Sequence, residues 1–219
     1  MLWDWGYALE ILPVLAKAAI VTIEATFLGF LIAASLGLVF AIMRMSGPLV
    51  AGPVTLLVEL VRSTPLLIQI FFLYFVLPKF GVTLDAFTAG VLALGLHYAT
   101  YCSEVYRAGL ENIPRGQWEA STALNLSSFT TFKDIILPQA IPPIVPALGN
   151  YLVALFKETP LLSAIAVLEL MQTAKILGSE TFRYVEPITL VGVIFLIMSL
   201  VSAAGIRWVE RVLNRRIAR

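Results

Sequence analysis

The stretch Gly116-Gln-Trp-Glu-Ala-Ser-Thr-Ala-Leu-Asn125, which continues to Pro138, is a polar island in an otherwise apolar chain. Its charged side chains and its Ser- and Thr-rich residues 127–131 are unsuited to hydrocarbon. Apolar residues nevertheless recur through it at helical spacings: Trp118, Leu124, Leu126, Phe129, Phe132, Ile135 and Ile136. The pattern predicts two short amphipathic helices at a membrane surface.

The rest of the chain has the composition of an integral membrane protein. Of 219 residues, 59% are hydrophobic and 13% are charged, and the mean hydropathy is +0.91. Soluble domains are about 45–50% apolar and about 25% charged. The single His and single Cys exclude a disulfide framework or a zinc site built within the chain. No basic segment precedes the first apolar run, so we expect no cleaved signal peptide.

Apolar runs are long enough to cross a bilayer, which takes about 20 residues of helix. The chain contains five such runs, at about 18–43, 54–77, 86–106, 141–167 and 187–208. Residues 1–17, with Trp3, Trp5 and Tyr7, read as an interfacial lead-in. Gly and Pro residues at 46–53 predict a short loop. We therefore expect an all-α fold in which 1–219 is one transmembrane domain, with the polar loop at about 110–138.

The distribution of Lys and Arg predicts the orientation of these spans. With the C-terminus inside, nine cations are cytoplasmic: Arg44, Arg107, Arg115, Lys133, Arg207, Arg211, Arg215, Arg216 and Arg219. Four then lie outside: Lys17, Lys79, Lys175 and Arg183. The positive-inside bias thus predicts an external N-terminus and a cytoplasmic C-terminus, and it makes the polar loop cytoplasmic.

Several separated motifs resemble one family of transport proteins. Glu119-Ala-Ser-x-x-Leu-Asn-Leu126, followed by Leu137-Pro138, is similar to the cytoplasmic EAA loop of permease subunits of ABC importers. Further motifs are similar to the polar amino acid (His, Glu, Gln, Arg) branch of these permeases: Ile113-Pro-Arg-Gly-Gln-Trp118, Glu59…Arg62-Ser-Thr-Pro-Leu-Leu-x-Gln69, Phe71–Phe75, Tyr101…Glu104…Arg107 and Lys157-Glu-Thr159…Glu169-Leu170. Within that branch, the chain resembles permeases for ectoine- and hydroxyectoine-type compatible solutes.

The resemblance implies a set of partners and a location. Each such permease has five spans and pairs with a second permease, here either a copy of this chain or a paralogue. Its EAA loop docks on a dimer of ABC ATPase subunits, and an extracytoplasmic solute-binding protein delivers the solute. The implied location is the bacterial cytoplasmic (inner) membrane. The resemblance implies no nucleic-acid partner and no cofactor or metal in this chain.

Two residues of the loop depart from the family pattern. Ser121 stands where the family has a second Ala, which keeps a small residue that we expect to face the partner. Asn125 stands where the family has Gly, which supplies a left-handed backbone between two short helices. Asn tolerates that conformation better than other L-residues, so we expect the turn to persist.

The loop is the expected point of energy coupling, because the chain has no Gly-x-x-x-x-Gly-Lys-Ser/Thr phosphate loop. ATP hydrolysis must therefore belong to a partner chain, and this chain is expected to be a transport subunit and not an enzyme. The residues that match the coupling motif are Gly116, Glu119, Ala120, Ser121, Leu124 and Asn125. We expect Glu119 to make a polar contact with the ATPase. On periodicity alone, an interfacial amphipathic helix without a partner fits the stretch equally well.

A repeated pattern marks a candidate solute path. Arg62-Ser-Thr-Pro-Leu-Leu67 and Lys157-Glu-Thr-Pro-Leu-Leu162 share the order basic–x–Thr–Pro–Leu–Leu. Both patterns fall roughly 12–24 Å into an apolar layer about 30 Å thick. Proline should break each helix there, and freed backbone and charges at that depth suit a path for a zwitterion. The candidate path residues are Arg62, Thr64, Gln69, Lys157, Glu158 and Thr159.

Structural alternatives accompany these assignments. Glu59 and Arg62 are three residues apart on one helix face, and a pair that fixes the fold is the favoured interpretation. The same holds for Glu104 and Arg107. For residues 157–159, path and scaffold roles stay open, and adjacent side chains cannot all face one pore. His97 is expected to be a packed polar residue.

The sequence thus predicts a permease subunit of an ATP-driven, binding-protein-dependent importer of polar amino acids or a related compatible solute. The alternatives are a secondary carrier and a membrane-embedded enzyme, either of them without an ATPase partner. The Thr-Pro repeat leaves room for the carrier. An enzyme would need a constellation of nucleophile and base, for which one His and one Cys offer little material.

Overall fold

The computed structural model describes residues 3–217, with side chains up to residue 213. All regular structure in this range is helical, as expected. The α-helices are α1 (Trp5–Arg44), α2 (Pro48–Ser63), α3 (Leu66–Phe71), α4 (Ala86–Glu111), α5 (Arg115–Ala123), α6 (Ser128–Thr130), α7 (Leu137–Glu158), α8 (Leu170–Thr181) and α9 (Val185–Ile217). Two π-helical segments (Phe72–Val76, Thr131–Ile136) and two 3₁₀ segments (Leu77–Phe80, Thr159–Ile165) continue α3, α6 and α7.

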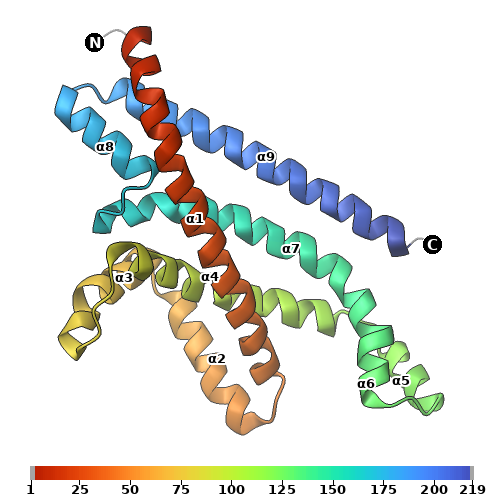
Figure 1. The fold of residues 1–219 in the computed structure, drawn as a ribbon. Coiled ribbons are helices and arrows are strands. Elements are labelled where there is room, and N and C mark those ends of the chain that lie inside the picture. The colour runs from red at the N-terminus through yellow and green to blue at the C-terminus, as the bar shows by residue number, and fades with distance from the viewer. Residues whose placement is uncertain (1–2, 218–219) are drawn as a thin grey trace.

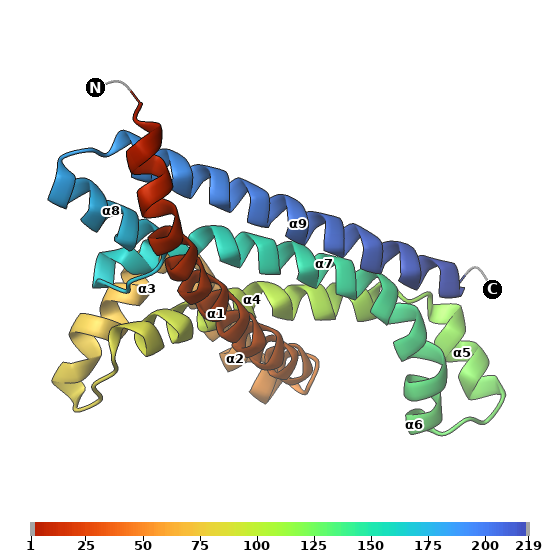
Figure 2. The ribbon, with the colours of Figure 1, turned by 45° about the horizontal axis from the view of Figure 1, so that its top comes forward.

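The helices form an open bundle with α4 and α7 in its middle (Figure 1). α1 crosses both of them obliquely, and α9 runs along the outer side of α7 (Figure 2). α8 and the start of α9 lie near the N-terminus at one end of the bundle, whereas α5 and α6 project from the other end (Figure 1). The polar loop of the sequence is this projection.

Small residues allow α1 and α4 to approach closely. Gly37 of α1 is buried, and a Cβ added there would lie 2.6 Å from the Cys102 Cβ and 2.8 Å from the Ala99 carbonyl oxygen. Gly95 of α4 lies equally close to α1, because a Cβ added there would lie 2.6 Å from Cγ2 of Ile32. Such contacts let two backbones pack without intervening side chains.

The helices differ in whether their length and composition suit a membrane span. Within the described part of the chain, three helical segments are long and apolar enough to cross a membrane: Trp5–Arg44, Ser128–Ile165 and Val185–Leu213. A fourth, Pro48–Ser63 with Leu66–Phe80, qualifies if its 102° bend lies within one span. α4 falls outside this group because its middle carries His97, Tyr98 and Tyr101, which lower its mean hydropathy. It packs against α1, α2, α3 and α7, so less of its surface needs to be apolar. The five-span count and the orientation stay predictions.

The helix ends differ in detail from the apolar runs of the sequence. α1 begins at Trp5, so residues 5–17 of the expected lead-in are helical, and Asp4 caps the helix by accepting from the N–H groups of Gly6 and Tyr7. The loop expected at 46–53 is confined to 45–47, since Pro48 occupies the first turn of α2, where a missing N–H costs nothing. Between the apolar runs at 141–167 and 187–208, residues Leu170–Thr181 form α8. Arg219 lies outside the described residues, as do the side chains of Arg215 and Arg216.

Candidate functional site

Both Thr-Pro sequences end a helix, as predicted. α2 stops at Ser63, and the chain turns by 102° before α3 starts at Leu66. α7 stops at Glu158, and Thr159–Ile165 continues as a 3₁₀ helix that ends at Ala166 in the left-handed region (φ 61°). Proline cannot donate a backbone hydrogen bond and clashes with the preceding turn, which is why each α-helix ends there.

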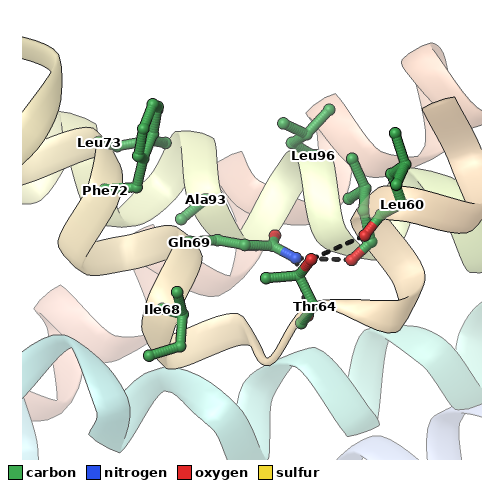
Figure 3. Close-up of a pocket in the computed structure, with 9 residues that line it drawn as sticks. Leu60, Thr64, Ile68, Gln69, Phe72, Leu73, Ala93 and Leu96 are labelled. Atoms are coloured by element: carbon green, nitrogen blue, oxygen red, sulfur yellow. Dashed lines mark hydrogen bonds between the residues drawn. The ribbon is translucent and has the colours of Figure 1, made fainter.

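Gln69 satisfies the backbone of the first break. Its Nε2 donates to the carbonyl oxygens of Val61 at 2.7 Å and Thr64 at 2.9 Å (Figure 3). The same nitrogen lies 3.1 Å from Nδ1 of His97. Figure 3 also shows that Gln69 lies beside an apolar cavity of about 320 Å³ between the bent pair and α4. Gln69 therefore supports the bend, and it does not line the polar cavity at Arg62 and Glu158.

A polar cavity of about 430 Å³ joins the two breaks. Its lining combines the first break with α4 and the end of α7: Arg62, Ser63, Thr64, Pro65, Leu66, Leu67, His97, Tyr98, Tyr101, Glu158 and Leu161. Of the six residues predicted for the path, this cavity holds Arg62, Thr64 and Glu158. It thus brings together one cation and one anion from helices that lie far apart in sequence.

Aromatic rings cover one wall of this cavity. Tyr98 and Tyr101 have ring centroids 5.9 Å apart, and His97 lies 5.4 Å from Tyr101. Tyr151 of α7 continues the cluster at 5.6 Å from Tyr101. The sequence pattern predicted no role for Tyr98 or Tyr151. Tyr98 lies three residues before Tyr101 on α4, and Tyr151 lies three residues after Leu148 on α7, so each shares a helix face with an inward-facing residue. The sequence alone does not show that α4 and α7 pack together.

The remaining predicted path residues lie elsewhere. Thr159 is fully buried, and its hydroxyl donates to the carbonyl oxygen of Phe156 at 2.8 Å, so it ends α7 and does not face the cavity. Lys157 is exposed and lines a separate cavity of about 420 Å³ between α7 and α9, with Asn150 and Arg207. Consecutive helical residues point about 100° apart, which explains why Lys157 and Glu158 enter different cavities.

The predicted ion pairs are present. Arg62 Nη2 donates to both carboxylate oxygens of Glu59, at 2.8 and 2.9 Å. Arg107 Nη2 lies 2.8 Å from Oε2 of Glu104. His97 is half-buried and packs among the rings, as expected.

The loop at the other end has the expected turn. Asn125 has φ 52°, in the left-handed region, and it lies between α5 and α6. The second arm is not a separate short helix, which corrects the prediction: α6, the π-helical segment and α7 form one helical run from Ser128 to Ile165. Pro138 does not interrupt the run; it directly follows the π-helical segment Thr131–Ile136, where the regular α-helical hydrogen bonding is already changed.

The loop exposes most of the residues predicted for coupling. Gly116, Glu119, Ala120, Leu124 and Asn125 are all exposed. Ser121 is the exception, because it is buried and its hydroxyl donates to the Gln117 carbonyl oxygen at 2.7 Å. The expectation that Ser121 faces a partner was therefore wrong: α5 is amphipathic, and this face packs against the second arm of the loop.

An apolar surface accompanies the exposed coupling residues. Trp118 is 41% exposed, Leu124 71% and Phe129 74%. A Cβ added to Gly116 would meet no atom within 4 Å, so nothing in the chain itself requires glycine there. The loop is thus a projecting element whose apolar face has no cover within the described chain.

Comparisons with known proteins agree with this architecture. The family of the binding-protein-dependent transport system inner membrane component matches residues 33–219. The probable amino-acid ABC transporter permease protein y4tG of Sinorhizobium fredii (strain NBRC 101917 / NGR234) is 47% identical over 98% of this chain and 95% of its own length. The L-cystine transport system permease protein TcyB of Bacillus subtilis (strain 168) is 35% identical over 94% of this chain and 89% of its own length.

Solved structures show the same fold. A chain from the crystal structure of an amino acid ABC transporter with histidines has a TM-score of 0.91 at 34% identity, with 96% of this chain and 99% of that chain covered. A chain of the MetNI methionine ABC transporter, in an inward-facing conformation, has a TM-score of 0.74 at 21% identity. The chain belongs to the family of binding-protein-dependent transport system inner membrane components, and it is a transport subunit of the inner membrane and not an enzyme.

Proposed function

We propose that this chain forms half of the translocation path of an ATP-driven amino-acid importer, and that the polar cavity at the two Thr-Pro breaks binds the solute. Its relatives are named as amino-acid, L-cystine and arginine permeases, which supports a zwitterionic amino acid as the solute class. Ectoine-type compatible solutes share that zwitterionic chemistry and belong in the same panel of candidates.

The observation that carries this proposal is that Arg62 and Glu158 line the same cavity of about 430 Å³. A guanidinium can bind a carboxylate through two parallel hydrogen bonds, and the carboxylate of Glu158 can accept from an ammonium group. The faces of Tyr98 and Tyr101 offer further attraction to a cation. The cavity therefore has opposite charges for the two ends of a zwitterion.

The projecting loop is the second part of the proposal. Trp118, Leu124 and Phe129 provide an apolar contact area, and Glu119 provides a charge at its edge. An ATPase subunit with a complementary groove would cover this surface and transmit its movement to α4 and α7. The proposed assembly contains two ATPase subunits, a second permease that is a copy or a paralogue, and an extracytoplasmic binding protein.

Direct solute binding tests the cavity. The purified complex of permease and ATPase, without the binding protein, would be titrated with radiolabelled amino acids and with ectoine. Arg62→Gln and Glu158→Gln should each weaken binding by about 10- to 100-fold, as expected for loss of a hydrogen bond to a charged group. Lys157→Met, which alters the neighbouring cavity, should have a smaller effect.

Two results would contradict the proposal. Unchanged affinity in both cavity variants would remove the cavity from the path. Solute uptake into proteoliposomes that contain this chain without any nucleotide or ATPase would exclude an ATP-driven importer and support a secondary carrier.

A further inference from the structure

A cluster of ion pairs lies between the solute cavity and the cytoplasmic loop, and Glu104 of α4 is at its centre. Oε1 of Glu104 lies 2.8 Å from Nη1 of Arg44 of α1. Oε2 accepts from Arg107 Nη2 at 2.8 Å and Nε at 3.2 Å. Arg62 of α2 approaches Oε1 at 3.6 Å. One carboxylate therefore faces three guanidinium groups from three helices.

The contacts of Glu104 differ in strength. The Arg44 side chain is 9% exposed, and it also donates to the hydroxyls of Thr55 and Ser103, at 3.3 Å each. A buried guanidinium needs an acidic partner, so the contact with Arg44 is fixed. The contact with Arg62 is longer than a hydrogen bond, and Arg62 donates instead to Glu59. The link between Glu104 and Arg62 is thus electrostatic and can be exchanged.

The cluster extends from the cavity to the last turn of α4. Arg62 lines the cavity at one end. At the other end, Nη1 of Arg107 donates to both carboxylate oxygens of Glu111 at 2.8 Å, and Glu111 is the final residue of α4. α5 starts only four residues later, at Arg115. A continuous chain of charges therefore joins the solute site to the base of the loop.

The base of the loop is packed firmly enough to move with α4. Ile113, between α4 and α5, is buried in a cluster with Ile136, Ala140 and Ile144 of the second arm. A Cβ added to Gly109 would lie 2.3 Å from Cγ1 of Ile144, so α4 and α7 are in close contact there. A displacement of the end of α4 is thus transmitted to both arms of the loop.

We propose that Glu104 is a positioning residue that relays solute binding at Arg62 to the cytoplasmic loop, an inference that rests on the proposed function of the cavity. A solute carboxylate that binds Arg62 competes with Glu59 and Glu104 for its guanidinium, and so weakens the attraction between Arg62 and Glu104. The carboxylate of Glu104 is then held mainly by Arg44, which is buried, and by Arg107, which is carried on the last turns of α4. The balance of forces on the end of α4 changes, and the loop moves with it.

The test uses the full transport complex with its binding protein in proteoliposomes, and compares ATPase activity with and without solute. Glu104→Gln keeps the shape and removes the charge. It should reduce the ratio of solute-stimulated to basal ATPase activity by about 10-fold, within the usual range of coupling between sites, and leave basal activity and direct solute affinity within about 3-fold of the unmodified complex. Glu10→Gln, which removes an exposed acid of α1 outside the cluster, is the matched control and should change the ratio less than about 2-fold.

A second variant keeps the test valid if Glu104→Gln does not assemble. The double change Arg44→Met with Glu104→Gln removes the buried cation together with its partner, so no charge is left uncompensated. It should show the same loss of stimulation. A normal ratio in either assembled variant, or failure of both to assemble, would overturn the proposal and leave Glu104 a structural residue. A failed cavity appears differently, as unchanged solute affinity in Arg62→Gln.

Discussion

Gln139 of α7 donates from Nε2 to Oε1 of Gln117 of α5, at 3.3 Å, and so joins the two arms of the loop near their base. The same nitrogen donates to the carbonyl oxygen of Ile135 at 2.7 Å, which holds the amide in place. With the arms joined, the shape of the projecting tip depends on the turn at Asn125.

Asn125 should therefore be sensitive to β-branched substitution and insensitive to glycine. Asn125→Val places a branched side chain at φ 52° and should cost about 1–2 kcal/mol, the penalty of a left-handed conformation for an L-residue. Asn125→Gly should be neutral or slightly stabilising. Co-purification of the ATPase with each variant, at matched expression, measures the effect on docking. Normal docking by Asn125→Val would show that the turn is not required.

Glu119→Lys should uncouple the transporter. The exposed carboxylate lies at the edge of the apolar surface of the loop, and reversal of its charge should remove solute-stimulated ATPase activity while the permease still folds. Glu10→Lys, an exposed reversal on α1, is the control that should retain stimulation. Equal solute uptake by Glu119→Lys and the unmodified protein would refute a polar contact between this residue and the ATPase.

Gly37→Ala should destabilise the helix pair α1–α4. The added Cβ would lie 2.6 Å from Cβ of Cys102, and helix separation to relieve such a clash costs about 1–3 kcal/mol. Gly192→Ala on α9, where a Cβ meets nothing within 4 Å, should be neutral. Thermal unfolding in detergent distinguishes them, and equal midpoints would refute the close packing.

Glu169 predicts a pH dependence outside the membrane spans. Burial raises the pKa of its carboxyl above the ordinary value of 4.5, although the N–H groups of Met171 and Gln172 partly oppose this shift. The folded chain thus retains a proton that the unfolded chain loses above pH 4.5, so stability should fall as pH rises from there through the folded pKa. Glu169→Gln, which retains an oxygen for these N–H groups, should abolish that part of the slope. Unfolding midpoints over this range, compared with the unmodified chain, provide the measurement; identical slopes would contradict it.

The helical class, the loop and the two breaks could be predicted from the sequence because each depends on local chemistry. Proline lacks a backbone donor and disfavours the α conformation of the residue before it, and Pro65 and Pro160 marked the breaks correctly. Pro13, Pro53, Pro142, Pro143 and Pro146 nevertheless lie inside α-helices, so proline alone does not locate a break. Asn125 was recognised because few residues other than glycine tolerate its conformation. Periodicity alone did not decide whether the loop has a partner; only the family resemblance led to its interpretation as the element that docks on an ATPase.

Other features depend on contacts between distant segments. The sequence paired Arg62 with Glu59, three residues away, but Glu104 and Arg44 join them only because α1, α2 and α4 meet. The sequence did not show that Lys157 and Glu158 line different cavities, because this depends on where α9 and α4 lie relative to α7. For the same reason Tyr98 lines the cavity and Tyr151 packs against its ring.

The uninterrupted course of α1 has a mechanical consequence. Its 40 residues form a rod about 60 Å long, roughly twice the thickness of a bilayer core. Its N-terminal part packs against α8 and α9 through Ile11 and Leu15, and its last residue, Arg44, contacts Glu104. A push on the N-terminal end would tilt the whole rod and reach the ion pairs at Arg44, so α1 can act as a lever between the two ends of the bundle.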